Sequence, residues 1–365
     1  MGPGMGPGMP PPPPKRGNGA VLAIVLGGAL VAVVLVAVVV VVVLANSGKT
    51  PEERLNAAAN SLSTARTLKL KGSFSYASDN LQGEVTVTRG GRVNGQVTWN
   101  GDNVTLLGAD NKLFVKAPKS YWTSKLSSLS SNSFLKEGDQ WGLVSNTELS
   151  LDFDRELTPA ALASEMRQIS RYTLRERETT VQGRKAYRVG SSLTTFYLSE
   201  DGELLRYESS TSPRVSADVT VQSTAASSSA ISQMRAQMGE LTDAFDSSKS
   251  PRNSAKPEFV DCDRGGAPCT VRVRVWSTRG GAPSVPIKVN FRLTSAQGGG
   301  TLYGECSSTG TVTGLDDVTV QCTISGGEWA RSGKNARRVW VSATPMAIAA
   351  TSSDVAAMQR GLDSE

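Results

Sequence analysis

The chain contains no histidine, and this limits the chemistry that its other residues could perform. Without histidine, a Ser-His-Asp triad, a Cys-His nucleophile and a histidine-based zinc site are all excluded. Two close carboxylate pairs remain, Asp152 with Asp154 and Asp316 with Asp317. Such pairs serve glycoside hydrolysis or Ca²⁺ binding when an open cleft or a ligand loop supports them, and neither pair lies in such a motif. We expect no catalytic residue, no metal site and no cofactor; an enzyme acting on cell-wall polymer is the outside alternative.

The four cysteines, Cys262, Cys269, Cys306 and Cys322, are the second group with a chemistry of their own. They form an even set within one stretch and have no histidine beside them, which favours disulfides over a metal site. Four cysteines allow three pairings. Short loops are the least costly to close, which favours Cys262 with Cys269 and Cys306 with Cys322. Because disulfides form in oxidising compartments, we expect this region to be extracytoplasmic.

An uninterrupted apolar run from Ala20 to Ala45 indicates how the chain is held at the membrane. As a helix it would measure roughly 39 Å, which is enough to cross a bilayer with some tilt. A cleaved signal peptide is the alternative, but its apolar core spans only about 7 to 15 residues. We predict one transmembrane helix over residues 20–45.

The orientation of this helix is not decided by nearby cations, because Lys15 and Arg16 precede it while Lys49 and Arg54 follow it. The expected disulfides decide it, and place the N-terminus in the cytoplasm and the later domains outside the cell membrane. Residues 1–19, rich in Gly, Pro and Met, cannot bury a core and are expected to be a disordered cytoplasmic tail. The formal net charge of +6 is too diffuse to indicate a nucleic-acid partner.

Alternation of apolar and polar residues predicts a sheet domain over residues 46–224. A capping box from Thr50 to Glu53 opens one amphipathic helix, and Thr158 with Pro159 opens another. Short Gly- and Asn-containing turns between the strands predict antiparallel meanders. The predicted strands are 68–76, 84–88, 93–99, 104–107 and 113–115, then 172–181, 185–189, 194–198, 204–208 and 215–221. The expected fold class is mainly β with α, namely a curved antiparallel sheet with both helices on one face.

Several segments of this domain resemble a known family. Together with the meanders, Tyr121-Trp122 and the segments Val181 to Val189 and Phe196 to Arg206 resemble the actinobacterial cell-envelope lipoproteins of the LppX and LprG kind. That family is similar in fold to the LolA and LolB carriers, in which a half-barrel closed by helices surrounds an apolar cavity. The resemblance implies a lipid or lipoglycan ligand for residues 50–222. Family members are anchored by a lipidated cysteine, which this chain lacks near Ala45, so a tethered form could bind lipid but could not shuttle freely.

If the half-barrel is hollow, apolar residues on one face of the strands and of the covering helix would line the cavity. The same residues could instead form an ordinary packed core. The candidates are Phe74, Tyr76, Val85, Val87, Val97, Trp99, Leu106, Val115, Leu162, Met166 and Ile169.

Three regions complete the chain. Residues 225–256 are expected to form a helix and a polar linker, the helix carrying in register Ile231, Met234, Met238, Leu241 and Phe245. Residues 257–350 alternate cleanly and have the size of a disulfide-bonded β-sandwich of immunoglobulin-like architecture. Residues 351–365 are expected to be a C-terminal tail.

The sequence therefore predicts a single-pass, non-catalytic binding protein of the cell envelope. In this interpretation the half-barrel holds a lipid or lipoglycan, and the sandwich contacts other envelope components or proteins. The alternative is an envelope scaffold, or an accessory subunit of a membrane complex, in which both modules are solid. A filled half-barrel would favour that alternative.

Overall fold

The computed structural model describes residues 49–365, apart from 77–78, 127–133, 145–152, 173, 212, 263–267, 278–283, 315 and 333–337. The chain divides into two compact units, Met1–Thr50 and Pro51–Glu365. The predicted tail over 1–19 and the predicted transmembrane helix over 20–45 lie outside the described residues. Among the residues that are described, no helix has the length and apolarity needed to cross a membrane.

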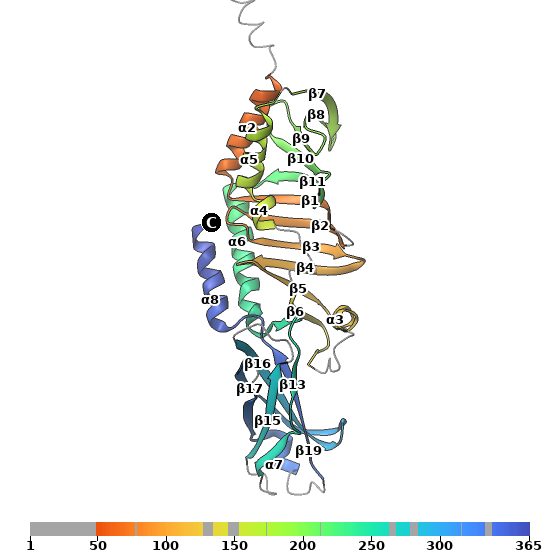
Figure 1. The fold of residues 1–365 in the computed structure, drawn as a ribbon, viewed down its shortest axis with the longest axis vertical. Helices are drawn as coiled ribbons and strands as arrows, with labels where there is room; N and C mark the ends of the chain where they lie inside the picture. Colours follow the sequence, from red (N-terminus) through yellow and green to blue (C-terminus); the bar gives the residue numbers. More distant parts are fainter. Residues whose placement is uncertain are drawn as a thin grey trace, which may run out of the picture. The chain divides into compact units, whose positions relative to one another are not determined.

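A twelve-stranded sheet forms the larger part of the second unit (Figure 1). Its strand order is β12-β6-β5-β4-β3-β2-β1-β11-β10-β9-β8-β7, which is not a closed barrel. The first meander consists of β1 (Thr67–Tyr76), β2 (Asp79–Thr88), β3 (Val93–Trp99), β4 (Asp102–Ala109), β5 (Lys112–Pro118) and β6 (Asp139–Val144). The second consists of β7 (Glu176–Val181), β8 (Arg184–Gly190), β9 (Thr194–Leu198), β10 (Leu204–Ser209) and β11 (Arg214–Val221). The two predicted meanders are thus confirmed.

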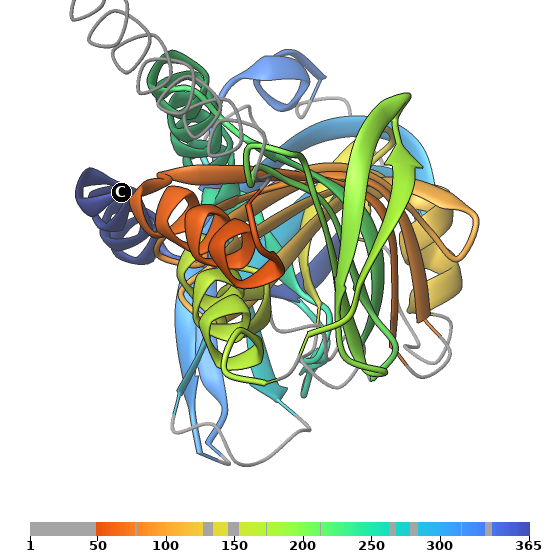
Figure 2. The same cartoon turned by 90° about the horizontal axis from the view of Figure 1, so that it is seen from above.

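The two meanders join where β1 pairs with β11, in a register that sets Leu68 opposite Val221 and Phe74 opposite Val215. Every neighbouring pair in the sheet is antiparallel except the short β12 (Phe245–Asp246), which runs parallel to β6. Figure 2 shows the sheet bending over helices α2 and α5. The two meanders therefore form one curved sheet, as expected from the sequence, because this long-range strand pair joins them.

Three two-residue hairpin loops have positive φ at both central residues. They are Asn100-Gly101 (50° and 100°), Asp110-Asn111 (51° and 60°) and Gln182-Gly183 (51° and 75°). Positive φ at both positions is the backbone of a type I′ turn, whose twist matches that of the strands it joins. These loops set the hairpin registers, and so decide which residues of each strand reach the same face.

Helices α2 (Pro51–Thr64), α4 (Phe153–Glu156) and α5 (Pro159–Ile169) cover one face of the sheet (Figure 1). Helix α5 begins as predicted, because the Thr158 hydroxyl accepts a hydrogen bond of 3.0 Å from the Ala161 backbone N–H. Helices α2 and α5 both turn an apolar side inward, which in α2 includes Leu55 and Leu62. A further helix, α3 (Lys119–Lys125), buries Tyr121 and Trp122 in the same cluster.

The opposite face of the sheet carries a second helical layer. The sequence predicted its first helix, with Ile231, Met234 and Met238 in register, but not its place on this face. Helix α6 (Thr224–Gly239), with the 3-10 turn η1 (Glu240–Asp243), packs there beside α8 (Ser352–Gly361) and η3 (Leu362–Ser364). Side chains alternate across a strand, so Leu106 belongs to the concave cluster whereas Leu107 belongs to the cluster that contains α6. Two expectations change: Phe245 lies on β12 rather than on the helix, and the stretch expected as a C-terminal tail forms α8.

The disulfide-bonded module is inserted between β12 and α8. One sheet contains β13 (Pro251–Asn253), β14 (Glu258–Cys262), β15 (Cys269–Ser277) and β18 (Val318–Ile324). The other contains β16 (Ser284–Ala296), β17 (Gly299–Thr313) and β19 (Trp340–Ala347), and α7 (Gly327–Ser332) packs beside β17. The chain crosses between the sheet module and this module twice, and the two crossings are adjacent. Phe245 forms a β-bridge with Ile348, and the Ala349 N–H donates to the Ala244 carbonyl at 2.9 Å.

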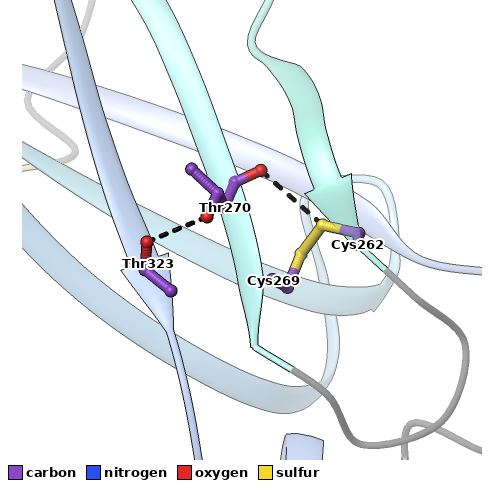
Figure 3. The surroundings of a disulfide bond; sticks show 4 residues. All are labelled: Cys262, Cys269, Thr270 and Thr323. Atoms are coloured by element: carbon purple, nitrogen blue, oxygen red, sulfur yellow. Dashed lines mark hydrogen bonds between the residues drawn. A yellow bond between two sulfur atoms is a disulfide. The ribbon is translucent and has the colours of Figure 1, made fainter.

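Both disulfides expected from the sequence are present, with the pairing that short loops favour: Cys262 with Cys269, and Cys306 with Cys322. The first closes the turn between β14 and β15, where the two cysteines are cross-strand partners (Figure 3). Thr270 follows at once, and its hydroxyl lies 2.9 Å from that of Thr323 on β18. The bridge therefore ties the edge strand β14 to the centre of its sheet.

The capping box of α8 gives a first prediction. The Thr351 N–H donates to the Asp354 carboxylate at 2.8 Å, and this contact, ahead of the opposing effect of burial, lowers the pKa of Asp354. Because this pKa is lowered in the folded protein, the carboxylate stabilises the fold at pH values above its ordinary pKa of 3.8. That stabilisation is lost as the pH falls below 3.8 and the carboxylate takes up a proton. Asp354→Ala should therefore lower the free energy of unfolding by about 1 kcal/mol at pH 7, measured by urea titration, and by much less near pH 3. Ser352→Ala, at an exposed position of the same turn, is the control.

Candidate functional site

The concave face, between the curved sheet and α2, α4 and α5, is where the predicted ligand-lining residues lie. Nine of the eleven candidates belong to one buried cluster, and Ile169 packs against it. They are Phe74, Val85, Val87, Val97, Trp99, Leu106, Val115, Leu162 and Met166. Tyr76 is the exception, since it is half-buried at the end of β1 and lies outside the cluster. The predicted strand faces are therefore correct for this layer.

These residues are packed rather than bordering open space. Phe74, Leu106 and Met166 are 0% exposed, and Val97 reaches only 4%. Accessible area includes internal cavities wide enough for water, so a side chain with none touches no space of that size. Interiors packed in this way leave no room for an acyl chain unless side chains move. At these positions the concave face is filled by the protein itself.

A half-buried carboxylate links the covering helix α5 to the sheet. Glu165 accepts a hydrogen bond from the Thr194 hydroxyl at 2.8 Å and another from the Tyr207 hydroxyl at 3.2 Å. Thr194 and Tyr207 are both buried, so this carboxylate satisfies two hydroxyls that have little access to water. The role of Glu165 is to hold α5 in place.

The same carboxylate changes the titration of its neighbours. Burial, followed by the charge of Glu165, raises the pKa of Glu156 above its usual value of 4.5. Burial, then the charge of Glu165, also raises the pKa of Tyr207. Raised carboxyl pKa values occur in general acids. Glu156, however, is largely exposed, and no group of metal-ligating side chains accompanies it among the described residues.

Helix α2 is attached to the far end of the sheet through Arg54, which is only 4% exposed. Its guanidinium lies 2.6 Å from the Glu176 carboxylate on β7 and stacks over the Tyr187 ring at 3.7 Å from the ring centre. A buried cation needs such partners, since an unpaired one would be strongly destabilising. Neither Arg54 nor Glu165 was predicted, because nothing in the sequence distinguishes them from solvent-facing charges on helices.

Of the two carboxylate pairs considered for catalysis, the structure describes only Asp316 with Asp317. Asp152 and the side chain of Asp154 lie outside the description, while Asp316 and Asp317 are exposed. Asp317 accepts a hydrogen bond of 2.8 Å from the Ser254 hydroxyl, which is a loop-fastening role. No protein-family model matches the chain, and no curated protein matches it either.

Removing the partner of Arg54 provides a test of the α2 attachment. Glu176→Gln leaves the guanidinium charged and buried, so the free energy of unfolding should fall by about 2 kcal/mol in chemical denaturation. Glu178→Gln, on the same strand, is the matched control, because its pair with Lys185 is more than half exposed and should contribute under about 0.5 kcal/mol. Equal effects of the two changes would show that Arg54 does not depend on Glu176.

A second test measures how tightly the concave face is packed. Leu106→Ala removes a side chain with no exposed area, and in a filled core this should lower the free energy of unfolding by about 3 kcal/mol. Leu193→Ala, at a position 56% exposed, should change it by less than about 0.5 kcal/mol. A loss below about 1 kcal/mol at Leu106 would contradict a filled interior.

Proposed function

We propose that this protein is a membrane-tethered, non-catalytic scaffold of the cell envelope, which presents its disulfide-bonded module to extracytoplasmic partners. The observation that carries the proposal is the filled concave face, where the residues expected to line a ligand cavity are buried against one another. The membrane tether over residues 20–45 and the extracytoplasmic location are part of the proposal, and rest on the apolar run and on the disulfides.

The way in which the sandwich is inserted supports this reading. It leaves the sheet module after β12 and returns into α8, so it is fastened at both ends. At the far end of α8, which follows the return, Arg92 pairs with the nearly buried Glu365 carboxylate at 2.6 Å, and Arg66 donates to the Glu365 carbonyl. A module fastened in this way suits presentation of a surface. We further propose that its two sheets form an immunoglobulin-like sandwich.

A second candidate is lipid or lipoglycan binding by a half-barrel related to the LppX and LprG lipoproteins. It is favoured by the composition of the concave layer, which is entirely apolar or aromatic at the predicted positions. Helices α2 and α5 cover this layer without pairing with any described strand, so they could move without breaking a strand pair. In this reading, ligand entry requires displacement of the helices together with Arg54 and Glu165.

Native mass spectrometry separates the two candidates. Residues 46–365, exported and purified from an actinobacterial host, should give a clean mass with no extractable lipid if the concave face is solid. The same protein offered lipids in solution should show no uptake. A stoichiometric lipid in the organic extract, lost on substitution of Leu106 by Trp in a variant that still folds, would replace the scaffold proposal with the lipid-binding one.

A further inference from the structure

The outer face of the β13-β15-β18 sheet carries a row of exposed side chains that is not used by the fold. Along β15, Val273 and Val275 point into the sandwich core, so Arg272, Arg274 and Trp276 point outward. Trp276 is 38% exposed. This is a large ring to leave in water on the centre of a sheet.

The register of the neighbouring strand adds a third guanidinium. Arg252 of β13 lies directly opposite Trp276, and cross-strand partners share a face at about 5 Å between their Cα atoms. Arg274 is two residues from Trp276, at about 7 Å. Two exposed arginines therefore flank one exposed indole on a single flat surface, which we call the Arg-Trp face: Arg252, Arg272, Arg274 and Trp276.

The charges of this face are only partly balanced. Arg272 pairs with Glu258 at 3.0 Å, with both side chains half exposed. Among the described residues, neither Arg252 nor Arg274 has an ion-pair partner within 4 Å, whereas Asp261 lies at the other end of the face, opposite Thr270. One carboxylate also lies near the Trp276 end: Asp317 precedes Val318, the partner of Val275, and accepts a hydrogen bond of 2.8 Å from Ser254. Guanidinium groups bind carboxylate and phosphate through two parallel hydrogen bonds, so Arg252 and Arg274 remain available to an anion beside this carboxylate.

The neighbours on β18 indicate what kind of anion fits. Thr319 and Gln321 lie opposite Arg274 and Arg272 and are exposed. The row from Arg272 to Trp276 on β15 is about 13 Å long. Thr319 and Gln321 would add a hydroxyl and an amide group beside this row. A membrane-binding surface would instead need several protruding apolar side chains, and this face has one aromatic ring. Stacking on an indole with adjacent hydrogen bonds suits a chain of sugar rings.

We propose that the Arg-Trp face binds an anionic polysaccharide, with Trp276 stacked on a sugar ring and Arg252 and Arg274 holding its acidic groups. This deepens the proposed function, because it names the class of partner that the sandwich would meet. It does not depend on the state of the concave face, so lipid extraction and polysaccharide binding can succeed or fail separately.

The experiment measures binding of fluorescent hexagalacturonate to the full chain in neutral detergent by anisotropy, with maltohexaose as the uncharged probe. Binding of hexagalacturonate should weaken about 10-fold in R252Q/R274Q and about 5-fold in W276A. It should also weaken as salt rises, because the contacts are between exposed charges. R252K/R274K should recover only part of the affinity, since lysine lacks the two-pronged geometry.

The matched control is R177Q/R188Q, which removes two exposed arginines that are cross-strand partners on the sheet module. This control loses the same net charge and should retain wild-type affinity within about 2-fold. An equal loss in both double variants, or no binding at all, would overturn the proposal. Binding of dihexanoyl phosphatidylglycerol in place of hexagalacturonate, with the same sensitivity to R252Q/R274Q, would assign the face to a membrane surface and would also overturn it.

Discussion

The pairing of β1 with β11 is the constraint on which the sheet module depends. It joins strands separated by more than a hundred residues, and without it the two meanders would be separate sheets of five or six strands. Each meander can form from local hairpins, whereas this pair must be closed across a long loop whose entropy cost only the combined core can offset. Leu68, Leu70 and Phe74 of β1 are all completely buried, which shows how much of that core forms at the join.

Once the sheet is joined, its two faces are covered by different parts of the chain. The concave face is covered by α2 and α5, which precede and follow the first meander in sequence. The opposite face takes α6 and α8, from beyond the second meander and beyond the inserted sandwich. Polar contacts join each helical layer to the sheet. On the concave side they are made by Glu165 and Arg54. On the opposite side, the Glu240 carboxylate accepts hydrogen bonds from Lys116 and Trp141. Apolar burial supplies most of the attraction, while these polar contacts fix the position of each helix.

Much of this architecture could be read from the sequence, because strand alternation and turn residues are local signals. The turns at Asn100-Gly101 and Gln182-Gly183 set hairpin registers, and Thr158 marked the start of α5. The helix that became α6 was predicted, but its packing on the second face of the sheet and the helix α8 were missed, although the adjacent Leu106 and Leu107 signalled that both faces of β4 are buried. Whether the concave face is hollow could not be predicted, since it depends on how side-chain volumes fit together. The Arg-Trp face depends on which residue of β13 lies opposite Trp276, and no local pattern carries that register.

The insertion of the sandwich has a mechanical consequence. A domain joined by one linker can rotate freely about it, whereas this one is held by two adjacent chain crossings, at Phe245 and at Ile348. Twisting about the connection is therefore resisted by two chain segments rather than by one. Tension applied to the sandwich would be shared between β12 in the sheet and α8 on the outer surface of the sheet, so a pulling partner would load the sheet and this helical layer together.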